Sequence, residues 1–363
     1  MKICLIGKNL TNFVLANVLA NKKINVDIFY SKNLRLLKND SPRTLAISSN
    51  NYEYIKKNNK KINISTWPSK KIKIYTEKNK SQELFEFANR ERNNFFLTKY
   101  NEIYNFFLKA LKKNYYVKFK KFEGNNNKWI ANKNYNLIIN SDPNGYITKK
   151  FFSKRLEKNY NSLAYTLVIT HAKLDNNIAI QIFTKDGPLA FLPLSKTQTS
   201  IVFSSTSINK MKIEKIKRII KKFNNKYEIS KYGKLESFQL KFLTLRNYYY
   251  KNIISFGDLL HKIHPLAGQG FNMSIRDIKI LSKIIQERID LGLDIDYSVG
   301  INFEKKTKHL NLIYGSSINL IYNFFNTDFK FNNSLSEPIF KIFKKNNFLN
   351  KYATYFSDRG LDI

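Results

Sequence analysis

The stretch from Ser255 to Asp277 has the residue types and spacing with the clearest chemical potential. Three of its glycines fall close together, in a chain with only 12 glycines among 363 residues. Gly257 permits a sharp turn after an apolar run, and the Asp258 carboxylate can accept hydrogen bonds from a polyol. Gly268 and Gly270 let the backbone approach a flat ligand because neither has a Cβ atom. The pattern predicts a loop that binds a flat, polyhydroxylated ligand.

A helix is predicted directly after this loop, beginning near Asn272. Its N-terminal amides and dipole would favour negative charge on the ligand. His264-Pro265 stiffens the loop, and we interpret His261 and His264 as loop-fixing residues rather than acid–base catalysts. Arg276 and Asp277 are interpreted as a structural pair on the helix. A strand–loop–helix connection without a ligand is the alternative, but it does not require two glycines, a proline and two histidines together.

The elements that must position the loop begin at the N-terminus. Residues 3–6 form a short apolar run, residues 7–12 a turn, residues 13–21 a pattern with helical spacing, and residues 25–30 a second strand. This order is typical of the first βαβ unit of a nucleotide-binding fold. The unit therefore predicts a parallel sheet near the loop.

The dinucleotide fingerprint Gly-x-Gly-x-x-Gly is worn in this turn. Gly7 is kept, but Asn9 and Asn12 stand where the second and third glycines would be. Tyr30 replaces the acidic residue that would bind a ribose hydroxyl. These changes predict weaker binding of a dinucleotide.

The rest of the chain predicts a second sheet and several helices. We expect strands at 70–75, 137–139, 163–169, 178–183, 190–194, 200–204 and 253–256, and helices at 100–114, 210–225 and 274–291. The strand-rich block 162–206 is typical of an antiparallel sheet inserted into the first domain.

The stretch from Gly257 to Asn272 resembles the flavin-binding signature of the class A flavoprotein aromatic-ring monooxygenases. More narrowly, it is similar to the ubiquinone-biosynthesis hydroxylases, whose motif is Gly-Asp-Ala-Ala-His followed by His-Pro-x-Ala-Gly-Gln-Gly-x-Asn. Leu259-Leu260 replaces the two alanines here. Pro42–Ser48 and Gln181–Leu194 resemble two further segments of the same family, and in order and spacing the resemblance covers about residues 1 to 330.

The resemblance implies FAD as the cofactor and assigns residues to it. Asp258 would bind the ribityl chain, Arg43 would lie against the ribityl-diphosphate region, and the helix from Asn272 would stabilise negative charge on the flavin. His264 and Pro265 would lie near the flavin ring. The expected cofactor-binding residues are Gly7, Arg43, Gly257, Asp258, Pro265, Ala267, Gly268, Gln269, Gly270 and Asn272.

The reaction implied is hydroxylation of the aromatic ring of a polyprenylated phenol in ubiquinone biosynthesis, through a flavin hydroperoxide. O2 is the expected co-substrate, and NAD(P)H or a ferredoxin-type donor the reductant. Because the flavin is the oxidant, no side chain is assigned a catalytic role and no metal is expected. Two alternatives stay open: a flavin hydroxylase of a small soluble aromatic, and a non-catalytic subunit of a quinone-biosynthesis assembly that has lost FAD.

The expected fold is α/β, with a discontinuous Rossmann-like FAD-binding domain, an inserted antiparallel β-sheet substrate domain and a helical C-terminus. The segments expected for the FAD-binding domain are 1–69, 96–160 and 249–300. Those expected for the substrate sheet are 70–95 and 161–248, and the C-terminal helices are expected at 301–363.

Composition limits the partners and the location. The formal charge is +36, but lysine is spread along the chain beside abundant Asn and Ile, as codon bias produces, so we expect no nucleic-acid partner. One cysteine excludes an intramolecular disulfide. We expect no membrane span and no signal peptide, and a cytoplasmic location, with the inner face of the cytoplasmic membrane as the alternative.

Two kinds of partner follow from the resemblance. Other ubiquinone-biosynthesis enzymes are expected to interact with the chain. Apolar residues in 310–325 and 339–356 could either contact a membrane peripherally, where a polyprenyl substrate dissolves, or close over the core.

Overall fold

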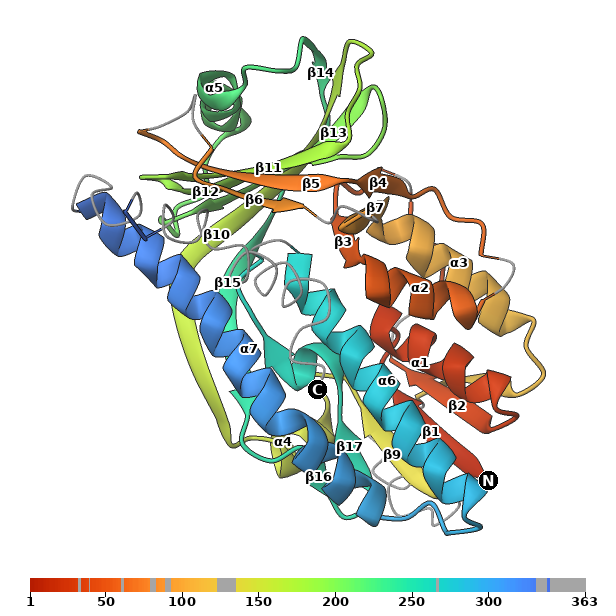
Figure 1. Cartoon of the computed structure of the whole chain (residues 1–363). Coiled ribbons are helices and arrows are strands. Elements are labelled where there is room, and N and C mark those ends of the chain that lie inside the picture. The colour runs from red at the N-terminus through yellow and green to blue at the C-terminus, as the bar shows by residue number, and fades with distance from the viewer. Residues whose placement is uncertain are drawn as a thin grey trace.

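The structure is a computed structural model that describes residues 1–31, 34–38, 40–59, 62–78, 83–88, 93–122, 135–265, 268–330 and 338–339. Figure 1 shows two large sheets, one above the other, joined along one side by the long helix α7 (Ser298–Lys330). Helix α6 (Gln269–Asp290) runs beside α7 and points its N-terminal end toward the upper sheet. The predicted flavin loop therefore lies where the two parts meet.

The lower sheet has six strands in the order β16-β17-β9-β1-β2-β8. All neighbours pair in parallel except β16 with β17. Its strands are β1 (Lys2–Ile6), β2 (Asn25–Tyr30), β8 (Val117–Lys121), β9 (Leu137–Asn140), β16 (Tyr249–Tyr250) and β17 (Ile253–Ser255). Strands β1, β9 and β17 are buried on both faces, as central parallel strands covered by helices require, whereas β8 and β16 at the two edges are partly exposed.

Helix α1 (Leu10–Asn21) follows β1 and is buried along almost its whole length. It packs against α3 (Tyr100–Lys112) and α6, so no face is left for solvent. The amphipathic α3 instead buries one stripe that includes Ile103, Phe107 and Leu111.

The upper sheet has nine strands, in the order β18-β15-β10-β13-β12-β11-β5-β6 with β14 paired to β10. Its strands are β5 (Lys71–Thr76), β6 (Phe85–Ala88), β10 (Arg155–His171), β11 (Ile178–Thr184), β12 (Gly187–Pro193), β13 (Gln198–Ser205), β14 (Ile229–Tyr232), β15 (Glu236–Leu245) and β18 (His261–Lys262). Helix α5 (Ile213–Phe223) covers one face with Ile216, Ile220 and Phe223.

One pair in this sheet departs from the expected antiparallel pattern, because β5 and β11 are parallel. The two strands come from parts of the chain that are far apart in sequence, and a long connection, unlike a hairpin, permits parallel pairing. The other pairs among β10 to β13 are antiparallel, as predicted.

A small third sheet, β3-β7-β4, connects the two large ones (Figure 1). Its strands are β3 (Thr44–Ser48), β4 (Trp67–Ser69) and β7 (Phe95–Lys99), and helix α2 (Ser49–Lys57) follows β3 directly. A short helix, α4 (Tyr146–Phe151), follows β9.

Several element boundaries differ from the sequence prediction, and two of the differences bear on the site and the domain assignment. Helix α6 begins at Gln269, three residues before the predicted start, because Gly268 caps it in a left-handed conformation with φ 65°. Strand β10 continues across the predicted domain boundary at 160/161 as one strand, so the domain boundaries stay a prediction. The C-terminal residues 310–325 lie within α7, whereas 339–356 lie almost wholly outside the described residues.

Among the residues that the structure describes, no helix has the length and apolar character needed to cross a bilayer.

Candidate functional site

In the loop from β17 to α6, Gly257 and Gly268 adopt a backbone conformation that other residues disfavour. Gly257 opens a 3-10 turn, η2 (Gly257–Leu259), with φ 64°, and Asp258 on this turn is exposed. A Cβ atom on Gly268 would lie 3.1 Å from the Cβ of Ala46, in a region of φ that already disfavours side chains. A Cβ on Gly270 would meet no atom within 4 Å, so this part of the backbone borders open space.

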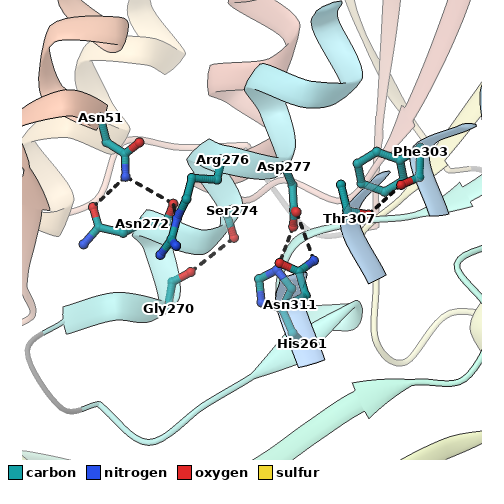
Figure 2. Close-up of polar contacts among 10 residues, drawn as sticks. All are labelled: Asn51, His261, Gly270, Asn272, Ser274, Arg276, Asp277, Phe303, Thr307 and Asn311. Atoms are coloured by element: carbon teal, nitrogen blue, oxygen red, sulfur yellow. Dashed lines mark hydrogen bonds and ion pairs between the residues drawn. The ribbon is translucent and has the colours of Figure 1, made fainter. Parts of the chain in front are cut away.

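Asn272 fastens the start of α6 to β3, and Figure 2 shows its contacts with Asn51 of α2. Its amide donates to the backbone oxygen of Ala46 at 2.8 Å, and its Oδ1 accepts from the Ser48 amide at 2.9 Å. Asn51 of α2 donates to the same Oδ1 and to the backbone oxygen of Asn272, both at 3.2 Å. Asn272 therefore holds the helix in place, and a direct cofactor contact by its side chain stays a prediction.

Arg43 contacts Tyr100, and both Arg43 and Asp258 act electrostatically on the Tyr100 hydroxyl. The exposed Arg43 places its guanidinium carbon 4.2 Å from the centre of the Tyr100 ring. Burial raises the pKa of the Tyr100 hydroxyl, with Arg43 opposing that shift and Asp258 adding to it, so the three groups lie within electrostatic reach. The sequence interpretation missed Tyr100, because its contact with Arg43 follows from the β3–β7 pairing and not from any motif.

In the turn from Gly7 to Asn12, the side chains of Asn9 and Asn12 hydrogen-bond to groups in or next to the turn itself and to Ser141. Asn9 caps α1 by accepting the Asn12 amide on its Oδ1 at 3.0 Å, and its Nδ2 donates to Ser141 Oγ at 2.6 Å. Asn12 donates to the backbone oxygens of Ile6 and Gly7. Gly7 has φ 109°, and a Cβ there would lie 2.7 Å from Ser141 Oγ. The glycine is thus required by the turn itself, whether or not a phosphate binds.

His264 is a loop residue whose ring is buried and neutral. The residue is 1% exposed, and neither ring nitrogen has a hydrogen-bond partner within the described residues. Burial lowers its pKa to about 3. The ring stacks on Tyr322 of α7, with centroids 4.2 Å apart. Pro265 is partly buried, and Ala267 lies outside the described residues.

His261 and Asp277 join the loop to α6 and α7 (Figure 2). His261 Nε2 lies 2.7 Å from Asp277 Oδ2, both residues are buried, and Asn311 of α7 donates to Asp277 Oδ1 at 3.0 Å. The interpretation of Arg276 and Asp277 as a pair is wrong, because neighbours on a helix point apart. Arg276 instead places its guanidinium carbon 4.1 Å from the centre of the Tyr314 ring.

A cavity of about 200 Å3 lies between the upper sheet, the small sheet and the start of α6. It is lined by aliphatic and aromatic side chains from β3, β5, β6, β7, β11, β12 and α7, with four polar residues: Ser69, Gln181, Gln269 and Tyr314. A dry apolar cavity of roughly 150 Å3 is enough for a benzene ring. The space therefore fits one aromatic ring with part of a substituent.

These residues fit FAD at the flavin end. Gly270 borders open space, Gly268 admits no side chain, and Asp258 and Arg43 are exposed beside the N-terminus of α1. The turn from Gly7 to Asn12 can bind the diphosphate only if the Asn9 side chain releases the backbone amide of Asn12. Among the described residues, no group of three or more His, Cys, Asp or Glu side chains could hold a metal ion.

A solved structure shares the whole architecture. The p-nitrophenol 4-monooxygenase of Pseudomonas putida superposes with a TM-score of 0.73, over 98% of this chain and 97% of that one, at 10% sequence identity. This likeness confirms the predicted fold class. A family model described as squalene epoxidase matches residues 161–355, which is more than half of the chain. The chain belongs to the squalene epoxidase family.

Curated relatives confirm the resemblance to the hydroxylases of ubiquinone biosynthesis. The mitochondrial ubiquinone biosynthesis monooxygenase COQ6 of Xenopus tropicalis is 25% identical over 235 residues, covering 53% of this chain and 50% of that protein. The 3-demethoxyubiquinol 3-hydroxylase of Escherichia coli is 29% identical over 149 residues, covering 39% and 38%. The chain thus matches about half or less of the length of these relatives.

Proposed function

We propose that the protein is an FAD-dependent monooxygenase that hydroxylates the aromatic ring of a polyprenylated phenol in ubiquinone biosynthesis. The observation that supports this most is the apolar cavity, because it shares Gln269 with the predicted flavin loop and fits one aromatic ring. Kinship with the ubiquinone hydroxylases supports the substrate class.

The cofactor site that we propose uses the loop and the two elements facing it. Asp258 would hold the ribityl chain, Arg43 the ribityl-diphosphate region, and Gly7 and Gly257 would keep the turns around them. Pro265, Ala267, Gly268, Gln269 and Gly270 would line the flavin ring, with His264 beneath. The domain assignment given by the sequence, including FAD-binding segments 1–69, 96–160 and 249–300, belongs to the same proposal.

The reaction inserts one atom of O2 into an aromatic C–H bond to give a hydroxyl group and releases the other as water. It consumes two protons and two electrons, with the electrons supplied by NAD(P)H or a ferredoxin-type donor. Bound FAD would supply the reductive activation of O2. The chain would exclude water with its apolar cavity and fix the ring against the start of α6. The backbone amides at the start of α6 would favour negative charge on the flavin ring bound beside them.

The polyprenyl tail would leave the cavity beside α7. Ile321 lines the cavity and is 40% exposed, so that side reaches the surface. Leu312, Ile313 and Leu320 of the same helix are also exposed. They support a peripheral contact with the inner face of the cytoplasmic membrane, where such a tail dissolves. We propose other ubiquinone-biosynthesis enzymes as partners that deliver the substrate.

Turnover under 18O2 tests this function. Protein with FAD and a reductant should add one 18O atom to a phenol with a short isoprenoid chain. Ala179→Leu, which fills the cavity, should lower this turnover severalfold, whereas Ala110→Leu on α3 should not. Turnover of 4-hydroxybenzoate alone would favour the hydroxylase of a small soluble aromatic. FAD-loaded protein that oxygenates neither compound would contradict the proposal.

The second candidate is a non-catalytic subunit that has lost FAD. The self-capped turn at Asn9 favours it, since the Asn9 side chain takes the place that a phosphate oxygen would need. A measurement of flavin binding distinguishes the two candidates, because the non-catalytic subunit would bind no FAD.

A further inference from the structure

One face of α7 braces the predicted flavin loop and helix α6 at three successive points. Asn311 donates to Asp277 Oδ1 at 3.0 Å, the Tyr314 hydroxyl donates to Gln269 Oε1 at 2.6 Å, and Tyr322 stacks on His264. These α7 residues recur at helical spacing, so they share one stripe. The loop is therefore held by a helix that is distant from it in sequence.

The middle contact of this brace also belongs to the cavity. Tyr314 and Gln269 are each 2% exposed, and both line the cavity. Burial raises the pKa of the Tyr314 hydroxyl, with Arg276 opposing, so the hydroxyl keeps its proton and donates. A hydrogen bond of this length between two buried groups orients both partners strongly.

We propose that Tyr314 is a positioning residue that holds Gln269 and the start of α6, and so couples occupation of the cavity to the environment of the flavin. This inference rests on the proposed function, since it requires FAD at the loop. A ligand in the cavity contacts Tyr314 and disturbs the Tyr314–Gln269 pair, which borders the flavin site. Such coupling is reciprocal, so each ligand changes the affinity for the other by the same factor.

The test compares Tyr314→Phe with Tyr54→Phe. Tyr54 of α2 also bonds to α6 through its hydroxyl, at 3.1 Å from Ser282 Oγ, but it lies beyond the loop and the cavity. FAD affinity is measured by flavin fluorescence, the flavin environment by the visible absorption band, and coupling by the difference spectrum when a phenol with a short isoprenoid chain is added. Thermal unfolding of each variant shows that it folds.

Tyr314→Phe should weaken FAD binding by roughly three- to tenfold, as loss of one hydrogen bond does, shift the absorption band and diminish the phenol difference spectrum. Tyr54→Phe should leave all three unchanged. Gln269→Leu removes the acceptor, and the double variant should be no worse than the poorer single variant.

Two results would overturn the inference. If wild-type protein binds FAD and Tyr314→Phe gives the same affinity and spectra as Tyr54→Phe, then Tyr314 has no positioning role, while the proposed function stands. If wild-type protein binds no FAD, both the inference and the proposed function fail.

Discussion

Asn9 sets how readily the first turn accepts a phosphate. Its Oδ1 takes the Asn12 amide, which is one of the free donors that the N-terminus of α1 would offer to an anion. Asn9→Gly should therefore tighten FAD binding, by roughly fivefold if one such hydrogen bond becomes available. The same change should cost the FAD-free protein about 0.5 kcal/mol of unfolding free energy, because a glycine cap is slightly poorer.

Fluorescence titration with FAD and denaturant unfolding without it measure the two effects of Asn9→Gly. Weaker FAD binding in the variant would show that the Asn9 side chain is itself a ligand for the cofactor. The account of a self-capped turn would then be wrong.

His264 makes stability depend on pH. Burial holds its pKa at about 3 in the folded protein, while an unfolded histidine titrates near 6.5. Between these values the unfolded chain binds more protons, so stability is complete above about pH 6.5 and falls as pH is lowered through the window. The titration of this one histidine lowers the free energy of unfolding by about 2 kcal/mol between pH 6.5 and pH 5.

Denaturant unfolding at pH 7 and pH 5 tests this contribution. His264→Phe keeps the stack on Tyr322 and should lose about 2 kcal/mol less than wild type over that interval. His309→Phe, at an exposed position of α7, controls for the removal of a histidine. Equal pH dependence in wild type and His264→Phe would rule out the buried neutral ring.

Among the elements, the start of α6 contains one glycine that the fold requires, Gly268, and one that we assign to cofactor binding, Gly270. Gly268→Ala should destabilise the protein by about 1–2 kcal/mol, because φ is 65° and the new Cβ would press on Ala46. Gly270→Ala should keep or slightly raise stability, since its Cβ meets no atom and alanine favours helix. It should nevertheless weaken FAD binding, because its methyl group points into the open space proposed for the flavin.

Thermal unfolding and FAD titration of the two alanine variants give a two-by-two comparison. If the flavin lies beside Gly270, Gly270→Ala must lose affinity for FAD without losing stability. If Gly270→Ala binds FAD as wild type does, the open space beside Gly270 is not the flavin site.

The loop motif also shows which part of the site could be predicted from sequence. Gly257, Asp258 and Gly268 were identified because turns and ligand approach impose local rules on residue type, and the structure gives both glycines positive φ. Tyr100 and Tyr314 were missed. Their roles come from strand pairing and from a helix that returns to the loop, and neither leaves a local pattern.

At the scale of the whole molecule, patterning predicted both sheets but not how α7 divides its apolar residues. The sequence pattern offered Leu312, Ile313, Leu320, Ile321, Phe324 and Phe325 as one apolar face, but the first four are exposed and Phe325 is buried. The buried stripe is instead Tyr314, Ile318, Tyr322 and Phe325. Both stripes have helical spacing in an aromatic-rich chain, so only the packing against the loop and the cavity decides between them.

We propose that the region where the two large sheets meet binds FAD. The most direct test is the visible absorption spectrum of the purified protein before and after FAD is added, with Asp258→Ala beside wild type. Asp294→Ala, an exposed carboxylate beyond the far end of α6, is the matched control. We predict a bound-flavin spectrum in wild type and Asp294→Ala that is lost or much weaker in Asp258→Ala. A wild-type protein that shows no flavin at saturating FAD would contradict the account and leave the non-catalytic subunit.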